Sequence, residues 1–334
     1  MSDRVAVIGA GSWGTAVAAL AAANAPTVLW ARRPELAEQI ASAHENGDYL
    51  AGQPLPAALE STSDVKAAVD GASVVVMGVP SHGFRAVLEE LRPSLAPGVP
   101  IVSLSKGMEQ DTQLRMTEVI ADVTPAHAAG VLTGPNLAKE VLQGSPAAAV
   151  VAFDDQAVAE SLQALFSTNT FRVYRNDDVV GCEVAGALKN VMAIACGMAD
   201  GMGFGDNTKA ALMTRGLAEL TRLGVALGGN PITFAGLAGM GDLVATCSSR
   251  QSRNRHVGEQ LGKGRKLDEI IAEMKMVAEG VKTARSVVAI ATKAGVEMPI
   301  AEQVVAVLDG EVSATDVIVR LMSRSAKAES HGIA

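Results

Sequence analysis

A glycine-rich turn near the start of the chain limits what the first half can fold into. Residues 4–8 form an apolar run rich in β-branched side chains, which predicts a buried strand. Residues 15–23 are mostly alanine with no breaker, which predicts a helix. The turn between them, residues 9–14, contains three glycines. A strand, a glycine-rich turn and a helix in this order are typical of a dinucleotide-binding unit.

Each glycine of this turn has a separate task in such a unit. Gly9 allows a tight turn, Gly11 lets the backbone approach a pyrophosphate, and Gly14 lets the helix pack closely on the strand. The N–H groups at the start of the helix would point at the phosphates. The alternative is a glycine-rich turn that binds no ligand.

Two arginines follow the next predicted strand, residues 27–30. In dinucleotide-binding folds this strand ends at the adenosine ribose, where a carboxylate would select NAD and an arginine would pair with the 2′-phosphate of NADP. Arg32 and Arg33 stand in that place. We therefore expect the cofactor to be NADP(H), NAD(H) or both, with NADP(H) accepted. The alternative is that both arginines are solvated surface residues.

The pattern of apolar runs changes once along the chain. Up to residue 176 short strand-like runs alternate with helical stretches, and beyond it long alanine-, leucine- and methionine-rich segments follow at helical spacing. The sequence predicts an α/β fold with an N-terminal doubly wound (Rossmann-type) domain for dinucleotide binding, residues 1–176. An all-α C-terminal domain for substrate binding and catalysis, residues 177–334, would follow it.

Composition excludes several classes of partner. A net charge of −8 and an aromatic content of 3% argue against nucleic-acid binding. The run without charge between Arg4 and Arg32 is long enough to span a bilayer, but glycines, an asparagine and a proline interrupt it. We therefore expect no integral membrane segment and a cytoplasmic protein. The three cysteines and five histidines are scattered without metal-ligand spacing, so no metal site is expected.

A lysine stands alone among the apolar residues of the first helical segment of the second half. Glu183, Gly186, Lys189 and Asn190 are spaced to share one face of that helix. A buried lysine is costly unless it is paired or neutral, and lowering its pKa to 7 or 8 would make it a general base. Asp242 could hold its amine in place. The alternatives are a lysine that reaches solvent and an aspartate that only caps a helix.

Three further positions lie where ligands bind in such a fold. Lys106 follows the strand predicted at residues 100–104, so we expect it to contact a phosphate or a carbonyl of cofactor or substrate. Gly134 begins a turn whose backbone can approach a ligand. Asn136 could contact the substrate or only cap the helix that follows.

A local excess of positive charge follows Asp242. From Arg250 to Lys266 there are six cations and one acid, Glu259, in a chain that is otherwise acidic. This predicts a site for a small dianion, with an arginine that binds a phosphate through two N–H groups. The alternative is a solvated basic loop.

Seven motifs in order along the chain resemble the bacterial NAD(P)-dependent glycerol-3-phosphate dehydrogenase family over almost the full length. They are GAGSWGTA from residue 9, SKG at 105–107, TGPNLAKE at 133–140, ALKN at 187–190, GLAGMGDLVATC at 236–247, SRN at 252–254 and VAEG at 277–280.

The resemblance implies roles for residues that match the motifs. Lys189 would be the proton acceptor, with Asp242 beside it, and Asn136 replaces the serine or threonine expected there. The implied contacts to the dinucleotide are Ser12, Trp13, Arg32, Arg33, Tyr49, Ala138, Arg253, Val277 and Glu279. The implied contacts to the substrate are Lys106, Gly134, Asn136, Lys189, Asp242, Ser252, Arg253 and Asn254.

The resemblance also implies an activity. Dihydroxyacetone phosphate would be reduced to sn-glycerol 3-phosphate by hydride transfer from NAD(P)H, which supplies glycerophospholipid biosynthesis, in a cytoplasmic homodimer. Two alternatives stay open from the residues alone. One is another two-domain hydroxy-acid dehydrogenase of the 6-phosphogluconate or ketopantoate type. The other is a non-catalytic NADP sensor.

Overall fold

The computed structural model describes residues 4–274, 278–326 and 328–329. The chain divides into two compact units, and each is discontinuous in sequence. The first unit consists of Met1–Ser105 and Leu114–Val179, and the second of Lys106–Gln113 and Val180–Ala334. The sequence predicted a single boundary after residue 176. It did not predict that the segment Lys106–Gln113 belongs to the helical unit.

The first unit is built on one sheet of eight strands in the order β3-β2-β1-β4-β5-β6-β7-β8. Strands β6 and β7 pair antiparallel, and the other neighbouring strands pair in parallel. The strands are β1 (Arg4–Ile8), β2 (Thr27–Trp30), β3 (Leu59–Thr62), β4 (Ala72–Met77), β5 (Ile101–Ser103), β6 (Ala129–Thr133), β7 (Ala147–Ala152) and β8 (Phe171–Asn176).

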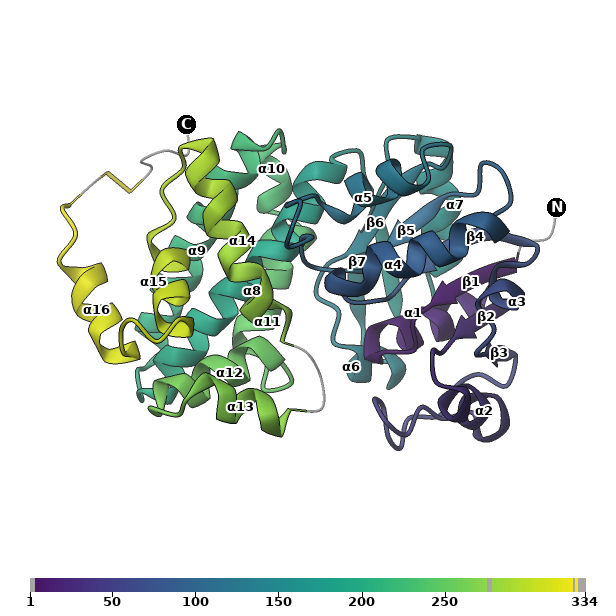
Figure 1. Ribbon diagram of the computed structural model, residues 1–334, viewed down its shortest axis with the longest axis horizontal. Helices are drawn as coiled ribbons and strands as arrows, with labels where there is room; N and C mark the ends of the chain where they lie inside the picture. The colour runs from purple at the N-terminus through teal and green to yellow at the C-terminus, as the bar shows by residue number, and fades with distance from the viewer. Residues whose placement is uncertain (1–3, 275–277, 327, 330–334) are drawn as a thin grey trace. The chain divides into compact units, whose positions relative to one another are not determined.

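Both faces of this sheet are buried, as side-chain alternation along β1 shows. Val5 and Val7 join one apolar cluster, and Ala6 and Ile8 join the other. Helices α1, α2, α6 and α7 cover the first cluster, and α3, α4 and α5 cover the second (Figure 1). A mostly parallel sheet with helices on both faces confirms the predicted doubly wound domain. These elements are α1 (Ser12–Ala22), α2 (Pro34–Ala43), α3 (Val65–Val69), α4 (Ser81–Leu91), η1 (Arg92–Ser94), α5 (Met116–Val123), α6 (Ala138–Leu142) and α7 (Gln156–Phe166).

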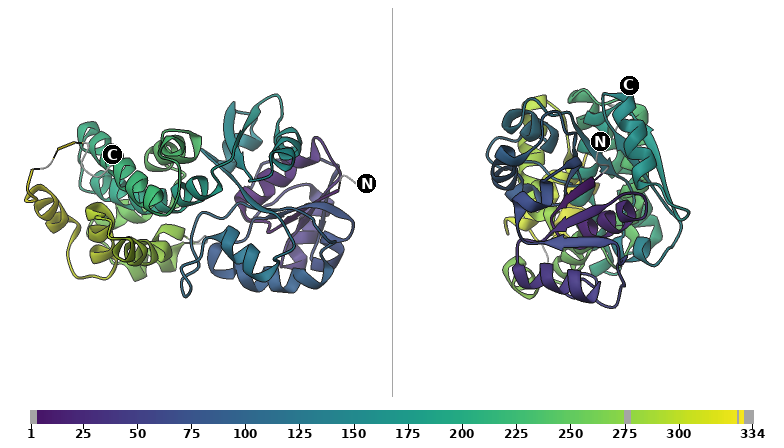
Figure 2. Two further views of the ribbon diagram at one scale, coloured as in Figure 1. Left: turned by 90° about the horizontal axis from the view of Figure 1, so that it is seen from above. Right: turned by 90° about the vertical axis from the view of Figure 1, so that its right-hand side faces the viewer.

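Among its described residues the elements of the second unit are all helices, joined by turns and loops, which confirms the all-α prediction (Figure 2). Its elements are α8 (Val179–Gly201), α9 (Asp206–Ala226), α10 (Pro231–Phe234), a π-helical turn (Leu237–Gly241), α11 (Asp242–Ser248), α12 (Arg253–Gly262), α13 (Leu267–Glu273), α14 (Glu279–Ala294), α15 (Pro299–Leu308) and α16 (Ala314–Met322).

Helix α8 is the core of this unit. Among the described residues it is the one helix long and apolar enough to cross a membrane, but nearly all of it is buried inside the protein. Other helices therefore cover its apolar surface. Glu183, Lys189 and Asn190 are each 5% exposed or less, so the polar residues of α8 must find their partners inside the unit.

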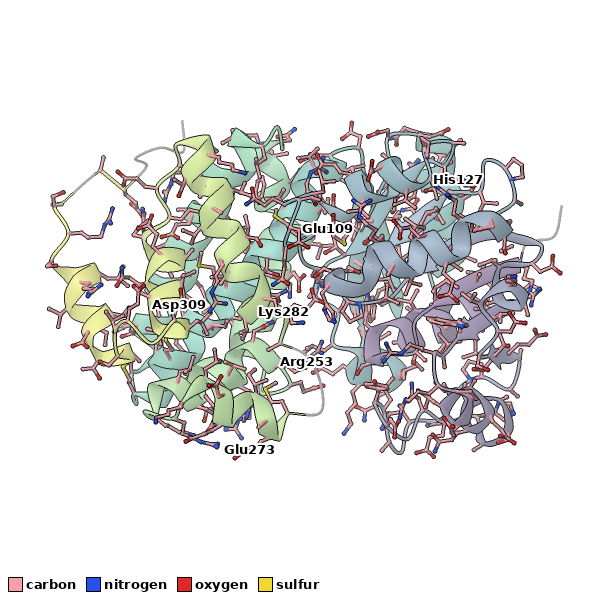
Figure 3. All side chains as sticks on the ribbon, viewed as in Figure 1. Glu109, His127, Arg253, Glu273, Lys282 and Asp309 are labelled. Atoms are coloured by element: carbon pink, nitrogen blue, oxygen red, sulfur yellow. The ribbon has the colours of Figure 1, made fainter. Side chains whose placement is uncertain are left out.

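Two helices cross at glycines and so fix the position of the SRN motif. A Cβ on Gly197 of α8 would overlap the carbonyl oxygen of Arg255, and a Cβ on Gly258 of α12 would overlap that of Ile194. Only glycine allows the backbones to approach this closely. The contact holds α12, which begins at Arg253 (labelled in Figure 3), against the same helix that carries Lys189.

The second glycine-rich stretch has a structure that the sequence did not predict. We expected a close turn before a helix starting near Asp242, and α11 does start there. The residues before it form the π-helical turn, an uncommon conformation that occurs often at functional sites. Gly239 is needed in it because a Cβ there would overlap the backbone of Phe234.

Candidate active site

The glycine turn after β1 has the geometry expected of a pyrophosphate cradle. Gly9 has a φ of +118°, and a Cβ there would lie 2.7 Å from the oxygen of Gly78. A Cβ on Gly14 would overlap the oxygen of Gly9, so α1 rests directly on the turn. At Gly11 the same test finds no described atom within 4 Å, which leaves room for a ligand. Each glycine therefore meets the requirement predicted for it.

The start of α1 also suits an anion. Gly11 is its N-cap residue, and within the described residues no side chain caps this end and its first turn carries no acid. An uncapped helix N-terminus without an acid is suited to a phosphate. The buried indole Nε1 of Trp13 has no hydrogen-bond partner among the described residues. A dinucleotide bound across this turn fits the helix N-terminus and the unused indole N–H.

The two arginines after β2 differ in what they contact. Arg33 is ion-paired with Asp48, which follows it in the loop after α2. Arg32 is exposed, and it makes no ion pair within the part of the chain that the structure describes. Arg32 is therefore the better placed of the two to meet a 2′-phosphate.

The turn after β6 leaves polar groups unused. Gly134 has a φ of +128° and packs on Ala149 of β7. Both amide atoms of Asn136 and the buried hydroxyl of Thr133 have no partner among the described residues. The interpretation of Asn136 as a helix cap is wrong, because Leu137 is the N-cap residue of α6 and no side chain bonds there. Unsatisfied buried amides at the carboxyl edge of a parallel sheet favour a ligand contact.

A buried cluster of four polar side chains forms the chemical centre of the second unit. Asp242, at the start of α11, is 2% exposed and accepts from Lys189 Nζ on Oδ1 at 3.0 Å. Thr246, one turn further along α11, accepts from Lys189 Nζ at 2.5 Å and lies 3.2 Å from Asp242 Oδ1. Lys189 is 5% exposed, so its ammonium is held between an aspartate and a hydroxyl inside the protein.

Lys106 completes the cluster from the segment that joins the helical unit. Its Nζ lies 2.6 Å from Asp242 Oδ2, so the carboxylate carries one lysine on each oxygen. Burial lowers the pKa of Lys106 to about 8; the charge of Asp242 opposes this shift, and the charge of Lys189 adds to it. The sequence did not single out Lys106 for a lowered pKa.

A chain of amides links this cluster to α12 and α14. Asn190 Nδ2 donates to the backbone oxygen of Lys106 at 2.9 Å, and its Oδ1 accepts from Asn254 Nδ2 at 2.9 Å. Asn254 Oδ1 accepts from the backbone N–H of Gly280 at 2.9 Å. Asn254 thus keeps only its second N–H for a substrate.

Most cations of the segment from Arg250 to Lys266 either form ion pairs or lie at the start of α12. Arg255 pairs with Asp200 at 2.6 Å, Lys263 with Glu259 at 2.6 Å, and Arg265 with Glu273 at 2.6 Å. These three cations therefore neutralise acids of the same unit. The predicted dianion site is reduced to the start of α12, where Ser252 caps the helix and Arg253 is exposed.

The remaining predicted residues lie at element ends or outside the description. Tyr49 is half-buried, and its backbone oxygen lies 3.5 Å from the hydroxyl of Ser12. Ala138 is the first residue of α6, and Glu279 is the first residue of α14. Val277 lies outside the described residues. Across the residues described, no group of three or more His, Cys, Asp or Glu could hold a metal ion.

Sequence reasoning missed one residue of the cluster, Thr246, and did not predict the partners of Asn190. Thr246 stands four residues after Asp242, so on a helix the two share a face, and this spacing could have identified it. Asn190 was placed on the face of Lys189, but its partners come from segments distant in sequence.

Comparison with protein families matches nearly the whole chain. Residues 4–159 match the model described as NAD-dependent glycerol-3-phosphate dehydrogenase N-terminus, and residues 178–319 match the model for the C-terminus of the same enzyme.

Similar proteins carry the name of the same enzyme and match this chain over nearly its full length. A glycerol-3-phosphate dehydrogenase [NAD(P)+] 2 from Sphingopyxis alaskensis is 57% identical and covers 99% of each chain. A glycerol-3-phosphate dehydrogenase [NAD(P)+] from Thermobifida fusca is 53% identical, again over 99% of each chain. The crystal structure of glycerol-3-phosphate dehydrogenase from Coxiella burnetii superposes with a TM-score of 0.92 at 35% identity, covering 97% of this chain and 99% of that one. A ketopantoate reductase from Ralstonia eutropha, at 17% identity and a TM-score of 0.60, shares the fold alone.

Proposed function

The chain belongs to the NAD-dependent glycerol-3-phosphate dehydrogenase family, and we propose from its side chains how it reduces dihydroxyacetone phosphate to sn-glycerol 3-phosphate. In the balanced reaction, hydride from NAD(P)H forms the new C–H bond at the carbonyl carbon, and a proton goes to the carbonyl oxygen. The cofactor, when bound, supplies and accepts the hydride. The chain must bind the phosphate, polarise the carbonyl and move the proton.

Lys189 carries the proton in this proposal. Its ammonium is buried and held by Asp242 at 3.0 Å and Thr246 at 2.5 Å, so its direction is fixed before substrate arrives. An ammonium in this position stabilises the alkoxide that forms during reduction and then protonates it. In the oxidation direction the neutral amine takes the hydroxyl proton. The paired burial of Lys189 is the observation that carries the proposal.

Lys106 adds a second positive charge to the same centre. Two lysines share one aspartate, so the cluster carries one net positive charge when both lysines are protonated. Such a centre favours an oxyanion over a neutral carbonyl, which is the change that the reaction makes. Asp242 therefore orients both lysines, and its full neutralisation by them prevents it from repelling the substrate.

The start of α12 binds the phosphate in this proposal. Arg253 is exposed at the first residue of the helix, and the second N–H of Asn254 is left for a phosphate oxygen. Ser252 orients this end as its cap. From the first unit, Gly134 and Asn136 are proposed as further substrate contacts because the amide of Asn136 is unsatisfied.

The first unit holds the dinucleotide in this proposal. The turn with Gly9, Gly11 and Gly14 and the N-terminus of α1 take the pyrophosphate. Arg32 takes the 2′-phosphate when NADP(H) is used. We propose Tyr49, Ala138 and Glu279 as further contacts to the dinucleotide, as the family resemblance implies.

A substrate panel tests the function. Absorbance at 340 nm should fall when the protein is mixed with dihydroxyacetone phosphate and either NADPH or NADH. No oxidation above background is expected with ketopantoate as acceptor. NADP+ reduction with 6-phosphogluconate should be absent as well. Turnover of ketopantoate or 6-phosphogluconate at a rate equal to that of dihydroxyacetone phosphate would contradict the proposal, and inactivity with all three would favour the non-catalytic alternative.

The cellular role is proposed from the family resemblance. We propose a cytoplasmic homodimer that supplies sn-glycerol 3-phosphate to glycerophospholipid synthesis. Removal of the gene should make growth dependent on added glycerol or glycerol 3-phosphate, and sedimentation should give twice the mass of the chain. Growth without the supplement would contradict the metabolic role. A monomeric mass would contradict the homodimer.

A further inference from the structure

A buried asparagine outside the predicted site residues contacts the glycine turn. Asn46 lies in the loop after α2 and is fully buried. Its Nδ2 donates to the backbone oxygen of Ala10 at 2.9 Å and to the hydroxyl of Thr15 at 2.8 Å. Ala10 stands between Gly9 and Gly11 in the turn, and Thr15 is near the start of α1. The two N–H groups of this amide are therefore used by the turn and by the helix that follows it.

The oxygen of the same amide holds its own loop. Asn46 Oδ1 accepts from the backbone N–H of Tyr49 at 3.3 Å, and the backbone oxygen of Asn46 accepts from the N–H of Leu50 at 2.8 Å. The backbone oxygen of Tyr49 lies 3.5 Å from the hydroxyl of Ser12, the first residue of α1. One side chain thus ties the loop to the turn, and every polar atom of its amide has a partner.

The bond to Ala10 fixes the direction of a backbone N–H group. The C=O of Ala10 and the N–H of Gly11 belong to one planar trans peptide, so they point in opposite directions. Because the oxygen of Ala10 points at the buried amide, the N–H of Gly11 points away from it. A Cβ on Gly11 would have no described atom within 4 Å. Asn46 therefore fixes this N–H at the glycine where the turn leaves room for a ligand.

The neighbouring groups of the turn are held by backbone instead. The N–H of Gly9 donates to the oxygen of Trp30 at 3.0 Å, and the oxygen of Gly11 accepts from the N–H of Thr15 at 2.9 Å. These bonds do not involve Asn46. Without its amide, the oxygen of Ala10 would lose its donor, and the peptide before Gly11 could rotate because glycine tolerates many backbone conformations.

We propose that Asn46 is a positioning residue for the dinucleotide, which holds the peptide between Ala10 and Gly11 so that the N–H of Gly11 meets an oxygen of the pyrophosphate. The inference rests on the proposed binding of NAD(P)H at the glycine turn. Asn46 acts through the backbone, because its own N–H groups are already used. Its loss should weaken cofactor binding and spare the chemical step, which depends on the Lys189 cluster.

Two substitutions of Asn46 test the proposal. Asn46→Ala removes the amide, and Asn46→Leu replaces it with a side chain of the same branching that fills the space without a polar atom. In both, the Kd of NADPH, measured by fluorescence, should rise at least about tenfold, as the loss of a hydrogen bond to a charged group predicts. KM for NADPH should rise as well, whereas kcat at saturating NADPH should stay within about threefold of the wild type.

A pair of small nucleotides reports on the turn alone. ADP and adenosine differ by the two phosphates, so the ratio of their inhibition constants against NADPH measures what the phosphates contribute to binding. ADP should bind more tightly than adenosine to the wild type, and most of this advantage should be lost in Asn46→Leu. Equal binding of the two by the wild type would contradict the cofactor site at this turn, and the inference with it.

Asn24→Ala is the matched control. Asn24 follows α1 in the same unit, and its Nδ2 also donates twice, to the backbone oxygens of Leu165 and Ser167, each at 2.9 Å. Its loss should lower the free energy of unfolding, measured in urea for all three variants. The Kd of NADPH should nevertheless stay within about threefold of the wild type, because these bonds lie away from the turn.

Three results would overturn the inference. They are wild-type NADPH affinity in folded Asn46→Leu, a rise in Kd for Asn24→Ala equal to that for Asn46→Ala, and an unchanged advantage of ADP over adenosine in Asn46→Leu. The Kd values decide the inference even if the wild type binds NADPH without oxidising it. That last result would contradict the proposed function alone.

Discussion

Asp242 is the residue around which the candidate active site is arranged. A carboxylate that is 2% exposed would be costly by itself, but Lys106 and Lys189 occupy both of its oxygens. The same pairs keep two ammonium groups inside the protein, where burial of an unpaired charge is costly. Removing Asp242 would therefore leave two unpaired buried cations, and we expect the loss of folding as well as of activity.

The pKa of Lys106 gives a prediction for the pH profile. Burial lowers this pKa to about 8, so the ammonium is lost at a lower pH than for an ordinary lysine. If Lys106 helps to stabilise the oxyanion, kcat/KM for dihydroxyacetone phosphate should fall as pH rises through about 8. Lys106→Arg keeps the charge to higher pH. The fall of kcat/KM at high pH, the upper limb of the profile, should therefore move to higher pH in this variant, even if its rate is lower. The measurement is kcat/KM from pH 6 to 10.

The control for this profile is the exposed Lys139. Lys139→Arg should leave the upper limb where the wild type has it. An unchanged limb in Lys106→Arg would show that another group titrates there.

Residue types and their spacing predicted much of this site, but not its pairing. Lys189 and Asp242 could be selected because each is out of place among apolar or glycine residues. The partnership of Asn190 with Asn254 and Lys106 could not be predicted, because it depends on how segments 84 and 64 residues apart meet. The capping role considered for Asn136 fails because the helix begins one residue later than its position requires.

At the scale of elements, the crossing of α8 and α12 positions the phosphate-binding end of α12. Four glycines face the opposing backbone: Gly197, Gly201, Gly258 and Gly262. Because there is no space for a methyl group, any side chain at these positions would push the two helices apart. Such a separation would move the SRN motif away from Lys189.

Gly258→Ala tests this crossing. The added methyl would overlap the oxygen of Ile194, so we expect the free energy of unfolding to fall by about 1–3 kcal/mol and KM for dihydroxyacetone phosphate to rise. Urea unfolding and steady-state kinetics measure the two effects. Gly83→Ala in α4 is the matched control because no described atom lies within 4 Å of its Cβ, and helix propensity makes it neutral or slightly stabilising. Equal effects of the two substitutions would contradict the proposed contact.

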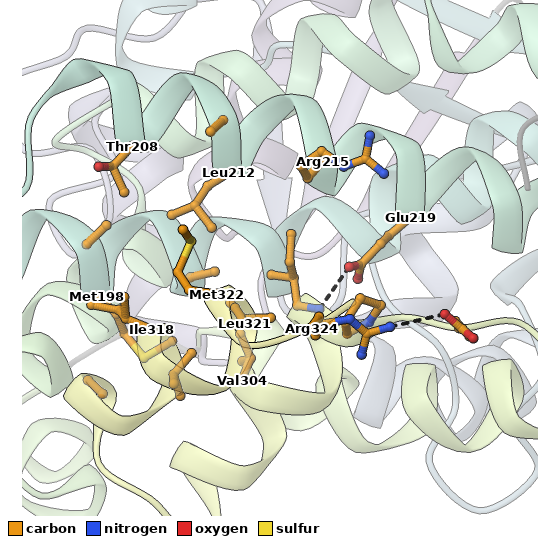
Figure 4. A pocket seen from close by; sticks show the side chains of 18 of the residues that line it. Met198, Thr208, Leu212, Arg215, Glu219, Val304, Ile318, Leu321, Met322 and Arg324 are labelled. Carbon is orange, nitrogen blue, oxygen red and sulfur yellow. Dashed lines mark hydrogen bonds and ion pairs between the residues drawn. The ribbon is translucent and has the colours of Figure 1, made fainter. Parts of the chain in front are cut away.

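Glu219 links α9 to the start of α15 in the helical unit (Figure 4). It should make the stability of the protein depend on pH. Burial raises its pKa to about 7, against about 4.5 in the unfolded chain. The folded state therefore holds a proton more tightly than the unfolded state between these values. Its contribution to stability is fully present below about pH 4.5 and is lost as pH rises through about 7.

Glu219→Gln should remove this dependence. Because the amide does not titrate, the stability difference between the variant and the wild type should change by up to about 3 kcal/mol in favour of the variant from pH 5 to 8. Urea midpoints at four pH values measure it, with the exposed Glu311→Gln as control. Parallel pH profiles for Glu219→Gln and the wild type would contradict the raised pKa.

Elements with strong apolar periodicity could be predicted, and those without it could not. Strand β1 and helix α8 are apolar along their length. Strand β3 has one buried residue of four, so nothing in its sequence separates it from a loop; it forms because β2 offers a free edge. The π-helical turn before Asp242 also resembles an ordinary glycine-rich loop, since its conformation depends on packing against Phe234.

At the scale of the whole molecule, two units divide the work that the reaction needs. The glycine turn of the first unit is shaped for a dinucleotide, and the lysine cluster of the second is shaped for proton transfer. The order of the two units could be read from the change in pattern after residue 176. The transfer of Lys106–Gln113 to the second unit could not, because a short segment between two strands carries no periodic signal.

The most direct test of the account is the turnover of Lys189→Ala with dihydroxyacetone phosphate and NADPH, measured together with NADPH affinity by fluorescence. The account predicts a fall in kcat of about 10²–10⁴-fold, the usual contribution of a general acid–base group, with NADPH affinity within about threefold of the wild type. A Lys189→Ala variant that binds NADPH normally and turns over at the wild-type rate would contradict it.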